Sequence, residues 1–285
     1  MSILIVIFMV SSMVFHAVYA IQQHEIGHAK HYDMLGVKNS INYCKDIYGK
    51  FSFRKLLTPS CDVRVEDIAQ LTPEQCKQNL MAGCRRNMSI AKDMALTAIV
   101  GFAWYKISII DVNAGHAALA LMITAFMAIG AIIEAFYGAG NWLSWPASND
   151  GAKVRAIIAA ENDYKNEPTM ENLMHLEIVK LLGDYFSLGY VAGIYGNVAH
   201  VHSTSNGYEY HTMLRLVDDK LEIQNYNTKD YTEPSAKYTE MMDYYKGLLS
   251  ARNRANAHSN ELKEIKYSKP VKIYGKHEPD IVTHH

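Results

Sequence analysis

Residues 6–32 read VIFMVSSMVFHAVYAIQQHEIGHAKHY, a stretch that joins an apolar run to a possible metal-binding motif. The run from Ile3 to Ile21 has His16 as its one ionisable residue, and its length suits a helix crossing a hydrocarbon core of about 30 Å. His24-Glu25-Ile26-Gly27-His28 follows directly, with the HExxH spacing of zinc hydrolases. The sequence therefore predicts a membrane helix with a metal site near its end.

The residue types of this motif support a defined chemistry. On a helix, His24 and His28 lie one turn apart on one face, so both can direct a ring nitrogen at one Zn²⁺ ion. Glu25 is rotated by about 100° from His24, which places it beside the metal as a general base for zinc-bound water. We therefore predict His24 and His28 as ligands and Glu25 as the catalytic base.

The distribution of apolar residues predicts a membrane part followed by a water-soluble part. We expect a membrane α-helical core over residues 1–155, and a small soluble α+β module over residues 156–285. The expected spans lie at about residues 3–28, 94–112 and 114–137, and a loop at 33–92 holds all four cysteines. The net charge of −1 offers no excess of Lys and Arg for nucleic-acid binding.

Local signals place the elements of the soluble module. Pro168-Thr169 and Pro234 each precede a helical pattern, and Asn206-Gly207 separates two β-prone runs as a hairpin turn would. That hairpin would set His202 opposite His211, with His200 on the same face. A solvated strand surface is the more common outcome for such a group, and a second metal site is the alternative.

Charge placement predicts the orientation of the chain. Lys and Arg are absent before the first span and occur after it and after the third span, so we expect the amino terminus outside and the carboxy terminus in the cytoplasm. The expected location is the bacterial inner membrane. A signal peptide cleaved after Ala20 is the weaker alternative, because it would remove the first turns of the HExxH helix. The same orientation favours reduced cysteines, with disulfides left open.

A catalytic zinc takes a third protein ligand, and the best candidate lies after the third span. Residues 140–154 read GNWLSWPASNDGAKV, whose Asn and Pro residues predict a break in the helix at the membrane edge that leaves Asp150 free to turn inward. In an antiparallel bundle this end lies at the depth of His24 and His28. The alternative is that residues 149–151 merely cap the next helix. Glu134 is a weaker candidate ligand, for which a hydrogen bond to another helix is expected instead.

These residues resemble the site-2 proteases, which are intramembrane zinc metalloproteases. Their first core helix carries HExxH followed by Leu-Gly-Val, as at His24–His28 and Leu35-Gly36-Val37 here. Their third core helix ends in Asn-x-x-Pro-x-Pro-x-x-Asp-Gly, of which residues 141–151 look like a degenerate version with Ser144 in place of the first proline. The resemblance implies Asp150 as third ligand and a role for Asn141 in holding substrate.

We therefore expect a zinc-dependent membrane metalloprotease that cleaves a membrane-spanning or membrane-proximal peptide bond. Its partners would be a membrane protein substrate and the lipid bilayer. One rival is a membrane-anchored scaffold protein whose HExxH is not catalytic. The other is a membrane-anchored zinc protease that acts on soluble substrates.

Overall fold

The structure is a computed structural model, and it divides into two compact units: residues 1–64 with 74–154, and residues 65–73 with 155–285. The prediction had placed residues 65–73 in the first domain. The model describes residues 2–43, 59–110, 114–143, 150–185, 191–205, 208–218, 220–228 and 233–258.

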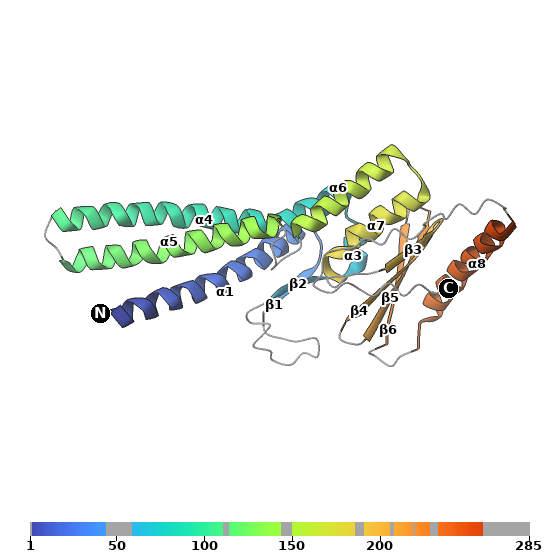
Figure 1. Cartoon of the computed structure of the whole chain (residues 1–285), viewed down its shortest axis with the longest axis horizontal. Coiled ribbons are helices and arrows are strands. Elements are labelled where there is room, and N and C mark those ends of the chain that lie inside the picture. Colours follow the sequence, from blue (N-terminus) through green and yellow to red (C-terminus); the bar gives the residue numbers. More distant parts are fainter. Residues whose placement is uncertain are drawn as a thin grey trace. The chain divides into compact units, whose positions relative to one another are not determined.

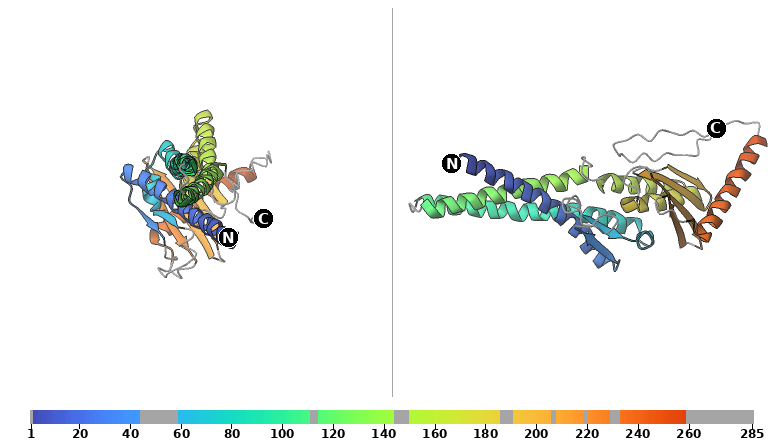
Figure 2. Two further views of the ribbon diagram at one scale, coloured as in Figure 1. Left: turned by 90° about the vertical axis from the view of Figure 1, so that its left-hand side faces the viewer. Right: turned by 90° about the horizontal axis from the view of Figure 1, so that it is seen from below.

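Three long helices dominate the first unit, and each is long and apolar enough to cross a membrane. They are α1 (Ser2–Met34), α4 (Pro73–Ile110) and α5 (Ala114–Leu143), which lie side by side in both sets of views (Figures 1 and 2). Many of their large apolar side chains are exposed, as expected of surfaces that face lipid. The predicted number of spans agrees with these three helices.

Helix α1 ends at a local stop signal. Gly36 has a φ of 72°, a left-handed conformation that glycine adopts without steric cost. The amide of Val37 donates to the carbonyl of Tyr32 at 3.0 Å, and that of Gly36 to Asp33 at 3.1 Å. This Schellman arrangement satisfies carbonyls at the helix end, which gives the Leu-Gly-Val sequence after the motif a structural reason.

The predicted loop at residues 33–92 was wrong in its second half. Helix α4 begins at Pro73, a residue suited to the first turn of a helix, and not near residue 94. The charged residues in its first half lower the mean hydropathy of this segment, so no apolar run predicted a helix there. Its buried stripe consists of small and polar residues at helical spacing, which are Cys76, Asn79, Gly83, Cys84 and Asn87.

Shorter elements occupy the rest of that predicted loop. Strands β1 (Asn39–Asn42) and β2 (Ser60–Val63) form an antiparallel pair, in which Ile41 faces Cys61. Helix α3 (Val65–Ala69) belongs to the second unit. Cys61, Cys76 and Cys84 are buried thiols, and Cys44 lies outside the described residues.

The second unit is built on a four-stranded antiparallel sheet in the order β3-β4-β5-β6. The strands are β3 (Val191–Tyr195), β4 (Val198–Ser205), β5 (Tyr208–Val217) and β6 (Lys220–Asn227). Helices α6 (Asp150–Asn166), α7 (Met170–Tyr185) and α8 (Ala236–His258) complete the described chain. The predicted α+β module is therefore present as a sheet with helices, although α6 begins within the first unit.

Caps and packing explain how the helices of this unit form. The hydroxyl of Thr169 accepts from the amide of Asn172 at 3.2 Å, and that of Ser235 accepts from Tyr238 at 3.0 Å, so each residue caps the helix that follows it. Helix α8 covers one face of the sheet through Tyr238 and Met241, which pack on Val198 and Met213.

His200, His202 and His211 share the face of the sheet that α8 partly covers. The register pairs His202 with His211 and His200 with Met213, so the predicted arrangement of the three histidines is confirmed. Burial and the neighbouring His211 and His202 lower the pKa of His200 to about 4.

Candidate metal centre

Helix α1 presents His24 and His28 toward the interior of the first unit. Their ring nitrogens Nε2 lie 3.1 Å apart, as expected for residues one turn apart on one helix face. His24 is 2% exposed and His28 8%, so both rings are buried.

Asp150 meets both histidines, although it lies more than a hundred residues further along the chain. Its Oδ2 is 2.8 Å from Nε2 of His24 and 3.4 Å from Nε2 of His28. Asp150 is also the first residue of α6, so the capping alternative and the site are compatible. Burial by itself raises the pKa of Asp150, but a proton on Nε2 of His24 or His28 is donated to this carboxylate and holds its pKa well below the usual range.

The hydrogen bond made by Nδ1 fixes the tautomer of each histidine. The amide group of Asn87 donates from Nδ2 to the carbonyl of Ala20 at 2.9 Å and to Oε2 of Glu134 at 2.6 Å. Its oxygen therefore faces Nδ1 of His24, 3.0 Å away, and accepts the proton of that nitrogen. Nδ1 of His28 donates to the backbone carbonyl of Asn79 at 2.8 Å.

Three lone-pair donors consequently face one another in a buried space. With both neutral rings protonated at Nδ1, the two Nε2 atoms and the carboxylate of Asp150 have no proton to share among them. Nζ of Lys153 lies 3.8 Å from Oδ1 of Asp150, but the two Nε2 atoms and Oδ2 still face one another and need either an extra proton or a metal cation between them. Histidines whose outer N–H donates to a carbonyl are the usual arrangement around a protein metal ion, so this group is suited to hold one.

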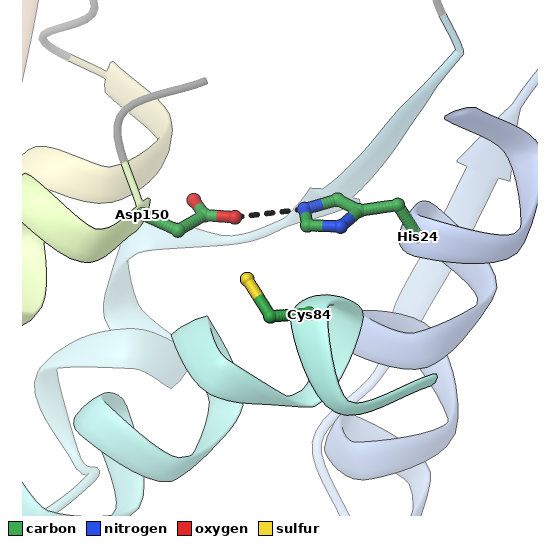
Figure 3. A group of neighbouring side chains, drawn as sticks. All are labelled: His24, Cys84 and Asp150. Atoms are coloured by element: carbon green, nitrogen blue, oxygen red, sulfur yellow. Dashed lines mark hydrogen bonds and ion pairs between the residues drawn. The ribbon is translucent and has the colours of Figure 1, made fainter. Parts of the chain in front are cut away.

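Cys84 on α4 is a fourth possible donor that our sequence analysis did not select. Its Sγ, a ring nitrogen of His24 and a carboxylate oxygen of Asp150 all lie within 4.8 Å of one another. Figure 3 shows the sulfur pointing toward the space between the other two side chains. The sequence carried a weak signal for it, because Cys84 and Asn87 lie three residues apart on one helix face.

Two glycines allow α1 and α4 to approach closely enough to build the site. A Cβ on Gly27 would lie 2.8 Å from the backbone oxygen of Ala82 and 2.8 Å from Cα of Gly83. A Cβ on Gly83 would lie 2.6 Å from the ring of His24. Small residues at such positions are typical of helix pairs in membranes. The glycine within HEIGH thus has a packing role.

Glu25 lies at the border of the site, where it binds strand β2. Its Oε2 accepts the backbone amide of Cys61 at 2.8 Å. The carboxylate uses one of its two oxygens in the bond to β2.

Asn141 and Glu134, both on α5, lie around the site without being part of the donor set. The amide nitrogen Nδ2 of Asn141 is 3.2 Å from Nδ1 of His24, and because Nδ1 already donates to Asn87, this contact is not a hydrogen bond in that tautomer. Glu134 makes the interhelical hydrogen bond that we expected for it, to Asn87 on α4. Residues 144–149, which include Ser144 of the degenerate motif, lie outside the described residues.

The fold and the site define a class of protein: three helices suited to a membrane, with a buried His, His, Asp group that can bind a metal ion. A comparison with known protein families, with curated proteins and with solved structures finds no match.

Proposed function

We propose that the chain is a zinc-dependent membrane metalloprotease. The observation that carries this proposal is the convergence of His24, His28 and Asp150, with both imidazoles held as Nδ1–H tautomers by carbonyl oxygens. Two imidazoles and one carboxylate are a donor set used by catalytic zinc sites, which keep the fourth position for water or substrate.

The separations between the three donor atoms, Nε2 of His24, Nε2 of His28 and Oδ2 of Asp150, fit a bound Zn²⁺ ion. Ligands at about 2.0–2.1 Å in a tetrahedron lie roughly 3.3 Å from one another. The three separations here are 2.8, 3.1 and 3.4 Å, so the donors need to move by only a few tenths of an ångström. A bound Zn²⁺ would supply a Lewis acid that polarises the substrate carbonyl and lowers the pKa of water toward about 7.

The surrounding residues take defined roles in this proposal. Glu25 accepts the proton of the attacking water and passes it to the leaving amine. Asn87 and Asn79 keep the lone pairs of the two histidines turned toward the site. Asn141 is in place to contact substrate near His24.

The position of the donors favours a peptide bond in or beside the membrane as substrate. Both histidines lie on α1, a helix suited to span a bilayer. The exposed apolar side chains of α1 include Val10, Val14 and Phe15. The Lys and Arg pattern favours a carboxy terminus on the cytoplasmic side, and the proposed location is the bacterial inner membrane. Water then reaches the site from the cytoplasmic end of α1.

The test compares new amino termini produced in one membrane by wild type and by Glu25→Gln. We expect termini inside or beside membrane spans that depend on Glu25 and disappear when the zinc chelator 1,10-phenanthroline is added. Glu25→Gln retains the zinc content of wild type in metal analysis, whereas His28→Ala and Asp150→Ala each bind one zinc per chain fewer than wild type. An identical set of termini in wild type and Glu25→Gln would refute the protease.

Cys84 supports a second candidate function, a membrane scaffold with a closed structural zinc site. Sulfur as a fourth ligand would leave no position for water. Replacing Cys84 with Ala distinguishes the two. The protease keeps its zinc and its cleavage, while a closed site loses affinity and the bundle loses stability.

A further inference from the structure

A second group of possible ligands lies on the soluble sheet, on strands β4 and β5. His202 and His211 are directly opposite each other across the two strands. Glu209 precedes His211 by two residues and so points to the same face. One ligand atom from each of the three side chains lies within 4.8 Å of the other two.

The polar atoms of this group are arranged in a way that suits a bound ion. Nε2 of His202 is buried and has no hydrogen-bond partner in the part of the chain that the structure describes. The rings of His202 and His211 stack with their centroids 4.7 Å apart. Nε2 of His211 is 3.4 Å from Oε2 of Glu209, close to the separation of about 3.3 Å between ligands of one tetrahedral ion.

His200 supports His211 from the other side. Its Nε2 is 3.1 Å from Nδ1 of His211. When His211 uses Nε2 as a ligand, its Nδ1 carries the proton and donates it to His200. This is the outer contact that normally fixes the tautomer of a histidine ligand.

We propose that His202, His211 and Glu209 bind a divalent ion of the zinc class. Two imidazoles and one carboxylate suit Zn²⁺, Co²⁺ or Ni²⁺ more than Mg²⁺ or Ca²⁺, which prefer oxygen ligands. Glu209 is 55% exposed as a side chain, so the ion can exchange with solvent. Its effect is to tie β4 to β5 near the end of the hairpin at which Ser205 pairs with Tyr208.

The test is Zn²⁺ binding to the full chain in detergent by equilibrium dialysis, in a His24→Ala/His28→Ala background that removes the other site. We expect one zinc per chain in that background. His202→Phe keeps an aromatic ring for stacking and abolishes this zinc. His200→Phe weakens binding by roughly 10–100-fold, as expected for the loss of an outer partner.

His116→Ala is the matched control, because His116 lies on α5 beside Trp104 and outside both groups. It leaves zinc binding unchanged. The proposal is overturned when the double-alanine background binds no zinc, or when His202→Phe binds as much as that background. Neither result bears on the protease, whose metal is measured as the difference in zinc content between wild type and His28→Ala.

Discussion

Replacing Asn87 with Leu tests whether the asparagine controls the metal centre. Asn87 is fully buried, and its three hydrogen bonds to Ala20, Glu134 and His24 have lengths of 2.9, 2.6 and 3.0 Å. Leucine fills a similar volume and removes all three. Bonds between membrane helices contribute about 0.6–1.7 kcal/mol each, so the expected loss of stability is about 2–5 kcal/mol.

The same change leaves Nδ1 of His24 without its acceptor. Loss of an outer partner costs roughly 10–100-fold in metal affinity, equivalent to about 1.4–2.8 kcal/mol. Zinc affinity is measured by competition with a fluorescent chelator in a His202→Phe background, so that the sheet contributes no signal. Stability is followed by thermal unfolding of the same samples.

Two further variants separate the effect on the metal from general damage. Asn79→Leu is the matched control, because this buried asparagine of the same helix contacts His28 through its backbone carbonyl, which the substitution keeps. Asn87→Asp keeps an acceptor for His24 but sets a second carboxylate against Glu134, so stability falls while zinc affinity is retained. Wild-type affinity in Asn87→Leu, or an equal loss in Asn79→Leu, would refute the reasoning.

Three other substitutions probe the packing that supports the two units. Gly27→Ala forces a Cβ to within 2.8 Å of the backbone of α4; we expect a loss of about 1–3 kcal/mol in thermal unfolding together with weaker zinc binding, and an unchanged melting curve would contradict the close contact. Gly151→Ala places a Cβ against the backbone carbonyl of Trp142 and so displaces the start of α6, which carries Asp150. Chelator competition should therefore show a larger loss of zinc affinity than for Asn87→Leu, and wild-type affinity would mean that α6 shifts without moving Asp150. Met241→Ala empties a fully buried position on the side of α8 that packs on the sheet and should cost about 2–5 kcal/mol in denaturant unfolding, whereas Ser250→Ala, at an exposed position of the same helix, should change stability by less than about 0.5 kcal/mol.

Local sequence signals predicted most of the elements correctly. Apolar runs indicated three membrane-suited helices, Pro168-Thr169 and Pro234 indicated the helices after them, and Asn206-Gly207 indicated the pairing of His202 with His211. Each of these signals depends on residues close together in the chain. The physical cause of each of these elements therefore lies within a short segment of the sequence.

The first half of α4 was missed for an equally physical reason. Its buried face consists of Cys, Asn and Gly, and its other faces carry charges, so no apolar stripe marks it. Cys84 and Asn87 were missed as site residues with it. Their importance depends on what they contact on α1 and α5, which no pattern within α4 records.

The sequence by itself determined the HExxH pair and its place near the end of a membrane-suited helix, because the spacing of one turn is a local property of the chain. Only the tertiary structure decided that Asp150 reaches both imidazoles, at 2.8 and 3.4 Å, and that Asn87 fixes the tautomer of His24. Those contacts join residues far apart in the sequence. Their distances follow from helix packing at Gly27 and Gly83, where the absence of a side chain lets two backbones meet.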